Sequence, residues 1–330
     1  NLLDDIIFIV HDLSPADTVH LKEQRVTAFV TDAGGPTSHT AILGRSLDIP
    51  SVIGLRNARQ LISEHEWVIV DGINGVLIIN PDDIVLAEYR RKLRAYKSKQ
   101  RELNKLKDTA ATTEDGTQIE LYANIENAED IKTLHKFGAD GVGLFCSEYL
   151  YLNRDTLPDE EEQYGVYADI VKKMKGKPLT IRTVDLGVDK NPRWFGQNGT
   201  PNGSLNPALG LTGIRLCLAE PVMFRAQMRA VLRAAAHGPV KMMWPMITSV
   251  SELKQCFTYL ETARRQLIER EETFSEVSTG CMIEISSAAL TVSSLLKLVD
   301  FISIGTNDLI QYTLSVDRGD DAVNYLYQPA

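Results

Sequence analysis

The chain has 330 residues, of which 44% are hydrophobic and 24% are charged, and its formal net charge is -9. This composition is that of a globular protein with room for two domains. An acidic chain lacks the basic surface that nucleic acids require, so we expect no nucleic-acid partner. Because no apolar run reaches the roughly 18 residues of a membrane span and no signal peptide is visible, we expect a cytoplasmic protein without membrane insertion.

The cysteines and the two ends of the chain give further bounds. The four cysteines are widely scattered and form no CxxC pair, which argues against a disulfide framework and against a zinc site. The sequence begins with Asn1 rather than methionine and stops directly after a strand-and-helix pattern. We therefore interpret it as part of a longer polypeptide.

The first 82 residues alternate short apolar runs with helical patterns, which predicts a small β/α domain. Asp71-Gly72 and Asn74-Gly75 indicate tight turns between the last two strands. The expected apolar strands or segments are Ile6–Val10, Val26–Val30, Ile42–Leu47, Ser51–Ile53, Trp67–Val70 and Gly75–Ile79.

A histidine follows a glycine pair within this domain, close to a predicted helix start. Gly34-Gly35 supplies the tight turn after the strand Val26–Val30, and Pro36 suits a first helical position, where its missing N–H costs nothing. The free N–H groups and the positive end of the helix dipole then lie beside His39. That environment favours a bound anion and a neutral imidazole, so His39 is a candidate phosphate-carrying nucleophile.

Residues around His39 fit this chemistry. Thr37 and Thr40 can donate hydrogen bonds to phosphoryl oxygens, and Arg45 can neutralise phosphate charge. An isolated histidine would more often simply pack or cap a helix. The combination of glycines, proline, hydroxyl residues and arginine favours the functional interpretation.

From Asp82 to Asp108 the sequence becomes a charged helix, with Tyr89, Leu93 and Tyr96 on one face. A solvated connecting helix is the simplest interpretation, and we prefer it to nucleic-acid binding. The polar run Thr109–Thr113 then predicts a loop.

Beyond Thr117, strand-like apolar runs alternate with helical segments. This alternation is typical of a parallel (β/α)₈ barrel, whose active residues lie at the carboxyl ends of the strands. Six such strands are visible, so we predict an α/β fold with a barrel truncated to about six strands. The expected strands are Ile119–Ala123, Gly141–Leu144, Leu179–Thr183, Lys241–Met246, Gly280–Ile285 and Phe301–Ile304.

Charged residues follow several of these strands at the expected barrel mouth. Glu284 and Asp308 lie one β/α unit apart, so both carboxylates can reach one hard cation. Mg²⁺ typically uses one or two protein carboxylates together with substrate phosphate, which matches this pair. Arg182 and Arg318 supply positive charge for phosphate and carboxylate oxygens. Each charged residue alone could equally form a surface ion pair.

Two motifs resemble those of the enzymes that use phosphoenolpyruvate (PEP). The segment around His39 resembles their phosphohistidine motif, and Phe301–Gly319 is very similar to the PEP-site signature of enzyme I of the bacterial sugar phosphotransferase system. Cys281–Glu284 resembles the segment that provides the second metal carboxylate. Phosphohistidine motif, charged helix and barrel occur in the order found in that family, so the resemblance covers essentially the whole chain.

The resemblance implies three domains and a role for each site residue. It implies a swivelling phosphohistidine domain at residues 1–82, a linker helix at 83–112 and a PEP-binding TIM barrel at 113–330 that is incomplete at its C-terminus. In this family assignment His39 accepts the phosphoryl group, Thr37 and Arg45 contact it, Arg182, Asn307 and Arg318 bind PEP, and Glu284 and Asp308 hold Mg²⁺.

Two positions depart from the family pattern. Cys146 and Thr212 stand where enzyme I normally has PEP-binding arginines. Charged hydrogen bonds are worth about 1.5–3 kcal/mol each, so these losses predict weaker PEP binding, by tens- to thousands-fold. The late barrel segment with the family's proton-donating cysteine and the helical region that binds the histidine phosphocarrier protein HPr have no counterpart in this sequence.

The function implied by the resemblance is phosphoryl transfer from PEP to His39 and on to HPr, the first step of sugar uptake by the phosphotransferase system. The family also implies a homodimer for the complete protein. Two alternatives remain at this stage: a degenerate paralogue that binds ligands or regulates without PEP turnover, and a relative of pyruvate phosphate dikinase or PEP synthase. The lack of a nucleotide-binding half favours enzyme I over the latter pair.

Overall fold

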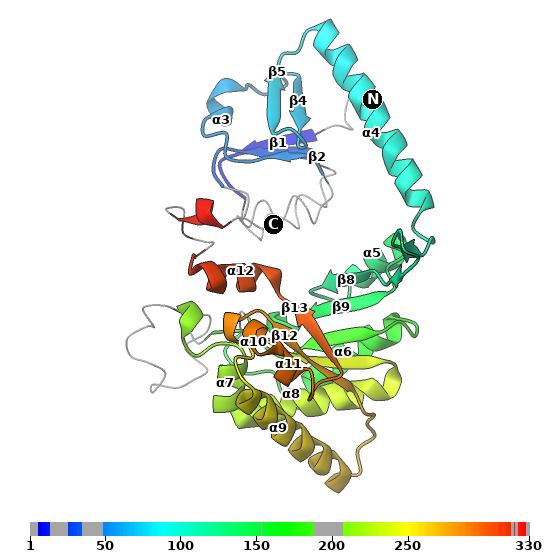
Figure 1. The fold of residues 1–330 in the computed structure, drawn as a ribbon. Coiled ribbons are helices and arrows are strands. Elements are labelled where there is room, and N and C mark those ends of the chain that lie inside the picture. The colour runs from blue at the N-terminus through cyan, green and yellow to red at the C-terminus, as the bar shows by residue number, and fades with distance from the viewer. Residues whose placement is uncertain are drawn as a thin grey trace. The chain divides into compact units, whose positions relative to one another are not determined.

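The chain divides into two units, Asn1–Asn104 and Lys105–Ala330, each of which is described by itself (Figure 1). The computed structural model describes residues 6–13, 26–34, 49–152, 154–187, 207–317, 320 and 323–327. Within these ranges, none of the helices combines the length and the apolar composition needed to cross a bilayer.

The first unit contains a small parallel sheet. Strands β1 (Ile6–Val10), β2 (Val26–Thr31) and β3 (Ser51–Val52) pair in the order β1-β2-β3, all in parallel. Phe29 of β2 is fully buried and packs with Leu13 and Val26 in a small core. The expected segment Ile42–Leu47 lies outside the described residues.

The described part of the first unit also contains a hairpin and two helices. The short helix α3 (Ala58–Leu61) precedes the antiparallel strands β4 (Val68–Asp71) and β5 (Val76–Ile79). Asp71 closes the turn by accepting hydrogen bonds from the backbone of Ile73 and Asn74, and Gly75 takes a left-handed conformation with φ +65°. The predicted turn residues therefore form this turn. Helix α4 (Asp83–Lys105) follows where a charged helix was expected.

The second unit begins with a hairpin that differs from the sequence expectation. The expected strand Ile119–Ala123 is split: β7 (Gln118–Ile119) pairs with β6 (Ala111–Thr112), and the sheet strand β8 begins only at Tyr122. Asp115 and Gly116 form the turn, with Gly116 at φ +88° and the Asp115 carboxylate accepting from the Thr117 backbone. This Asp-Gly turn converts part of the predicted loop Thr109–Thr113 into a strand.

A six-stranded sheet forms the centre of the second unit, in the order β13-β12-β11-β10-β9-β8. All five strand pairs are parallel, which confirms the predicted α/β class with six barrel-type strands. After β8 (Tyr122–Ile125) the strands are β9 (Gly141–Cys146), β10 (Leu179–Arg182), β11 (Val240–Trp244), β12 (Ser278–Ile283) and β13 (Phe301–Ile304).

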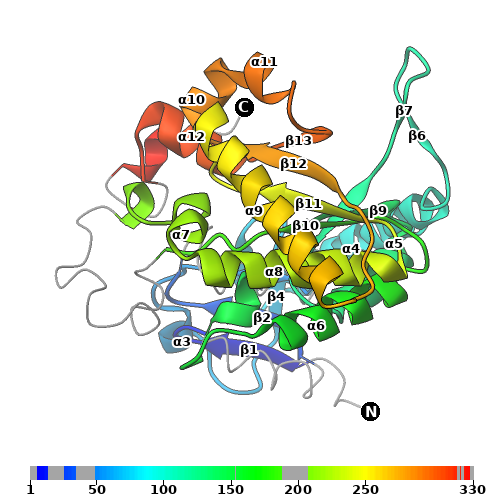
Figure 2. The ribbon, with the colours of Figure 1, turned by 90° about the horizontal axis from the view of Figure 1, so that it is seen from below.

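Helices connect successive strands, as a parallel sheet requires. Figure 2 shows α8 and α9 running across the strands of this sheet. The helices are α5 (Asp130–Phe137), α6 (Glu160–Lys173), α7 (Ile214–Ala219), α8 (Pro221–Ala234), α9 (Val250–Glu269), α10 (Ser286–Leu290), α11 (Val292–Leu295) and α12 (Thr306–Leu314), with 3₁₀ turns at Ser147–Tyr151, Pro207–Leu209, Ala235–His237 and Asn324–Leu326.

Gln227 of α8 is a fully buried polar residue that ties several elements together. Its Oε1 accepts from the Val184 backbone N–H at 3.0 Å, and its Nε2 donates to Ser147 Oγ at 3.0 Å and to Tyr167 Oη at 3.1 Å. Ser147 Oγ in turn donates to the Arg182 carbonyl at 2.7 Å. Both polar atoms of the Gln227 side-chain amide are thus hydrogen-bonded near the carboxyl ends of β9 and β10, where the candidate site lies.

Replacing Gln227 by Leu should destabilise the second unit by about 3 kcal/mol, because the buried Val184 N–H loses its acceptor and the hydroxyls of Ser147 and Tyr167 each lose one of their hydrogen bonds. The matched control is Met228→Leu on the same helix, a volume-conserving change at another fully buried position, which should cost less than about 1.5 kcal/mol. Urea unfolding followed by circular dichroism measures both. Equal stabilities for the two variants would contradict the role assigned to the Gln227 network.

Candidate functional site

Five charged side chains gather at the carboxyl ends of neighbouring strands. Arg182 ends β10, Glu284 directly follows β12, and Asp308 lies in the first turn of the helix after β13. Glu148, just after β9, and Asp185, just after β10, complete this group. Because the strands are parallel, their carboxyl ends meet at one edge of the sheet. We call these five residues the strand-end cluster.

Arg182 is the cation of the strand-end cluster, and its side chain is only 14% exposed. Its Nη2 lies 3.0 Å from Glu148 Oε1, and its Nη1 lies 2.9 Å from Asp185 Oδ2. Burial lowers the pKa of Arg182, but the carboxylates of Glu148 and Asp185 outweigh this and raise it. The guanidinium is thus permanently charged and clamped in place by two carboxylates.

Glu284 is completely buried. Its Oε1 accepts a hydrogen bond from the Met246 backbone N–H at 2.6 Å, whereas its Oε2 is buried without a hydrogen-bond partner among the described residues. Burial, together with the nearby Asp185 carboxylate, raises the pKa of Glu284 to about 7, and Asp308 contributes in the same direction. A buried carboxylate oxygen without a donor is suited to a cation.

Asp308 and Asn307 occupy the amino end of α12 (Thr306–Leu314). The charge of Asp308 raises the pKa of both Glu284 and Asp185, after burial itself, so the three carboxylates share one electrostatic environment. Asn307 Oδ1 accepts a hydrogen bond from the Tyr327 hydroxyl at 3.0 Å. The structure therefore brings Arg182, Glu284 and Asp308 into one region.

The two positions that depart from the family pattern lie beside this cluster. Cys146 ends β9 opposite Arg182 of β10, with its Sγ 3.9 Å from Arg182 Nη2. Burial and the Glu148 charge raise the pKa of Cys146 to about 11, so its sulfur is a thiol and not a nucleophilic thiolate. Thr212 pairs with Gly187 in an isolated bridge and precedes Gly213.

Gly213 allows the close approach of Asp185. At Gly213, with φ +53°, a Cβ atom would stand 2.7 Å from Met246 Cγ and 2.8 Å from Asp185 Oδ1. A side chain there would displace one of the carboxylates that clamp Arg182. Gly305 is comparable, since a Cβ atom there would lie 2.7 Å from Glu284 Oε2. Glycine at these two positions keeps space at the carboxylates.

The strand-end cluster offers carboxylate oxygens of the kind that divalent cations bind. Glu148 and Asp185 pair with Arg182, while the buried Glu284 lies within the electrostatic influence of Asp185 and Asp308. Among the residues that the structure describes, no group of three or more His, Cys, Asp or Glu side chains is arranged to hold a metal ion. Mg²⁺ commonly takes one or two carboxylates from a protein and completes its coordination with water or substrate oxygens, so Glu284 and Asp308 are candidates for such a pair.

Glu148 and Asp185 were not among the candidate residues taken from the sequence. The signal was nevertheless present, because Glu148 lies four residues and Asp185 two residues beyond the end of a predicted strand, close to the expected carboxyl edge of the sheet. Four other candidates, Thr37, His39, Arg45 and Arg318, lie outside the described residues.

In the metal-free chain the buried Glu284 should make stability fall as pH rises. Its folded pKa of about 7 exceeds the ordinary value of 4.5, so the folded state binds more protons than the unfolded state between these pH values. The resulting loss is on the order of 2–3 kcal/mol from pH 4.5 to pH 7.5. Glu284→Gln should flatten this slope in urea unfolding with EDTA present, whereas Glu276→Gln, at a side chain that is 67% exposed, should preserve it. An unchanged slope in Glu284→Gln would contradict the burial argument.

Comparison with known proteins places these observations in a family. Residues 100–330 match the model of the PEP-binding domain of PEP-utilising enzymes, and residues 3–75 match that of the mobile domain of the same enzymes.

Curated relatives extend the match over almost the whole chain. Proteins named phosphoenolpyruvate-protein phosphotransferase are 47% identical over 98% of this chain in Cupriavidus necator, 42% over 99% in Staphylococcus carnosus and 42% over 99% in Bacillus subtilis. The chain spans 55%, 56% and 57% of the lengths of these relatives, respectively. The mobile-domain match precedes the PEP-binding-domain match along the chain, in the order of the motifs found in the sequence. The strand-end cluster also agrees with those motifs. The chain belongs to the family of PEP-utilising enzymes.

Proposed function

We propose that this chain transfers the phosphoryl group of PEP to His39 and from there to HPr, as the enzyme I component of a sugar phosphotransferase system in the cytoplasm. The observation that carries the proposal is the strand-end cluster, in which a clamped Arg182 lies beside the Glu284 and Asp308 carboxylates. The similarity to curated phosphoenolpyruvate-protein phosphotransferases supports the same reaction.

The strand-end cluster supports binding of PEP. PEP carries a phosphate and a carboxylate, and the planar guanidinium of Arg182 can donate paired hydrogen bonds to either group. Glu148 and Asp185 hold that guanidinium in one orientation, so little side-chain entropy is lost when the substrate arrives. Asn307 and Arg318 are proposed as further donors to PEP, and Arg318 lies outside the described residues.

Glu284 and Asp308 are the proposed ligands of Mg²⁺. The buried, unpartnered Oε2 of Glu284 and the excess of carboxylates are the features that fit a divalent ion. When bound, Mg²⁺ supplies charge that offsets these carboxylates and polarises phosphoryl oxygens. Without such charge, the approach of a trianion to four carboxylates is opposed by repulsion.

His39 is the proposed acceptor of the phosphoryl group, with Thr37 and Arg45 as its neighbours on the phosphate. Phosphoryl transfer passes through a loose transition state, so catalysis requires mainly alignment and charge neutralisation. We propose that residues 1–82 swivel as one domain on a linker at 83–112 to deliver His39 to PEP on the domain at 113–330. A homodimer of the complete protein belongs to the same proposal.

Incubation with PEP and Mg²⁺ should attach an acid-labile phosphate to the chain at His39. Intact-mass spectrometry at neutral pH should show a phosphorylated species that disappears in His39→Asn. The matched control is His65→Asn at an exposed site with φ +67°, a conformation that Asn tolerates, and it should label normally. Labelling that survives His39→Asn would contradict the assignment.

Restoring positive charge beside Arg182 should strengthen PEP binding. The double substitution Cys146→Arg and Thr212→Arg adds two cations near an acidic region, and each charged hydrogen bond is worth about 1.5–3 kcal/mol. Calorimetric titration with PEP and Mg²⁺ should therefore show affinity rising at least about tenfold. An affinity that falls or stays constant, in a variant that unfolds at the same urea concentration as the parent chain, would show that these positions do not face the substrate.

A further inference from the structure

Helix α4 carries a concentration of positive charge that contrasts with the rest of the chain. It contains eight Lys or Arg residues and three Asp or Glu residues, so it contributes +5 to a chain of net charge -9 and leaves -14 elsewhere. None of its 23 residues is buried in the described part of the chain. A simple connecting helix needs no such excess of one sign.

Four of these basic residues form one stripe along the helix. Arg90, Arg94, Lys97 and Arg101 follow the spacing i, i+4, i+7, i+11, which places them on one face over about 17 Å of helix. Like charges at this spacing destabilise a helix. We refer to these four residues as the basic stripe.

The four cations of the basic stripe differ in their surroundings from neighbouring cations on α4. The described residues supply no ion pair to any of its four members, and all four are exposed. By contrast, neighbouring cations on the same helix are engaged: Arg91 Nη2 lies 2.8 Å from Glu88 Oε1, and Lys92 Nζ lies 4.3 Å from the centre of the Tyr89 ring. The stripe therefore remains available to an external acidic group.

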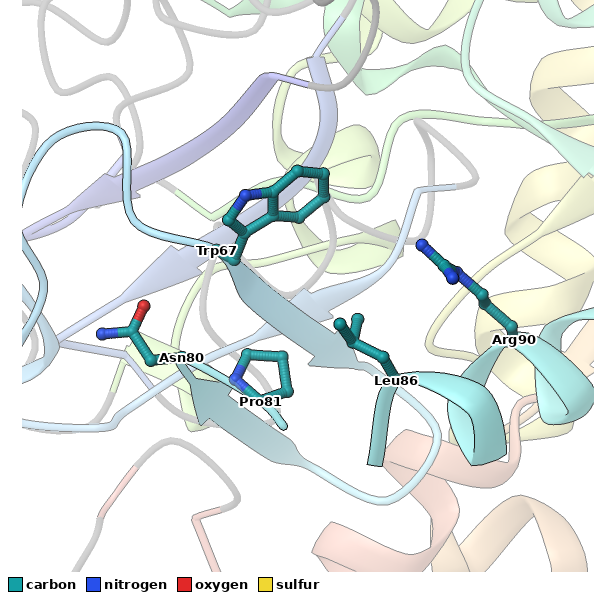
Figure 3. A pocket seen from close by; sticks show the side chains of 5 residues that line it. All are labelled: Trp67, Asn80, Pro81, Leu86 and Arg90. Carbon is teal, nitrogen blue, oxygen red and sulfur yellow. The ribbon is translucent and has the colours of Figure 1, made fainter. Parts of the chain in front are cut away.

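A pocket lies at the amino-terminal end of the basic stripe. It encloses about 220 Å³ and is lined by Trp67, Asn80, Pro81, Leu86 and Arg90 (Figure 3). Leu86 and Arg90 project from α4 toward the hairpin that carries Trp67, a residue that is 64% exposed. Arg90 thus belongs to both features, and the stripe leads directly into the pocket.

The walls of this pocket are fixed by hydrogen bonds. The Asn80 backbone N–H donates to the Trp67 carbonyl at 2.8 Å, and Asn80 Nδ2 donates to Glu66 Oε1 at 2.9 Å. Glu66 Oε2 also accepts from the Ser63 backbone at 2.7 Å. The Glu66 carboxylate next to Trp67 is therefore already hydrogen-bonded within this chain, and the pocket presents both apolar side chains, from Trp67, Pro81 and Leu86, and polar ones, from Asn80 and Arg90.

From these features we infer that the pocket and the basic stripe together bind an acidic helical segment of another polypeptide. Carboxylates spaced along one face of that segment would pair with the stripe, and one aliphatic or aromatic side chain at its end would enter the pocket beside Trp67. Charge complementarity selects the partner, and the pocket fixes its register.

An acidic polypeptide fits these observations better than an extended polyanion. The chain outside α4 carries a net charge of -14. The negative potential of a nucleic acid or of an anionic membrane would repel this charge. A short acidic helix interacts electrostatically mainly with the basic stripe that it covers. A discrete pocket lined in part by the apolar side chains of Trp67, Pro81 and Leu86 also accepts a single anchoring side chain, a feature of helix-in-groove recognition.

The test uses the chain itself and a synthetic helical peptide with Glu at i, i+4, i+7 and i+11 on one face and Leu at one end. Fluorescence anisotropy of the labelled peptide should show saturable binding that weakens as salt rises. Arg94→Glu with Lys97→Glu should weaken binding at least about tenfold at low salt, and Trp67→Ser should weaken it without changing its salt dependence.

The matched control is Lys99→Glu with Lys132→Glu, which makes the same change in net charge at exposed positions off the stripe. This control should bind the peptide like the parent chain, and a peptide isomer with the same residues scattered around its helix should bind more weakly. Equal losses in the stripe and control variants, no binding at low salt, or tighter binding to phosphatidylglycerol vesicles or to a 20-nucleotide RNA would each overturn the inference.

Discussion

The parallel arrangement of β8–β13 is the constraint on which the rest of the second unit depends. Parallel strands end at one edge, so side chains from separate β/α segments meet there although up to 160 residues separate them in sequence, from Glu148 to Asp308. Burial at that edge makes uncompensated charge costly: Arg182 is paired with Glu148 and Asp185, whereas the Oε2 atom of Glu284 has no hydrogen-bond partner among the described residues. This buried carboxylate oxygen is the feature on which the cation site that we propose rests.

Support for the strand-end cluster comes from a second layer of buried polar groups. Gln227 binds the backbone after β10 and the serine after β9, and that serine binds the carbonyl of Arg182. Gly213 and Gly305 leave space at the Asp185 and Glu284 carboxylates, because a Cβ atom at either position would stand within 2.8 Å of a carboxylate oxygen. The Gln227 network thus holds the strand ends in position, whereas Gly213 and Gly305 leave room for the charged groups of the strand-end cluster.

Much of this organisation follows from the sequence, because alternating apolar runs and turn residues are local signals. The six sheet strands and the Asp71–Gly75 turn were predicted from such patterns, and membership of the PEP-utilising family was predicted from the motifs around His39 and Asp308. The split of Ile119–Ala123 into two strands was missed, because the apolar residues continue across the break while the Asp115-Gly116 turn lies upstream. The ion pairs of Arg182 depend on tertiary contacts that no local pattern encodes, so Glu148 and Asp185 were not assigned to the site from the sequence, although both follow predicted strands.

The central claim is that Glu284 and Asp308 share one divalent cation with PEP. Titration of the chain with Mn²⁺, followed by electron paramagnetic resonance as a substitute for Mg²⁺, tests it directly. PEP should increase Mn²⁺ affinity, and Asp308→Asn should weaken Mn²⁺ binding while urea unfolding of the metal-free chain is little changed. Mn²⁺ binding that is indifferent to both PEP and Asp308→Asn would show that Glu284 and Asp308 do not hold a cation together with PEP.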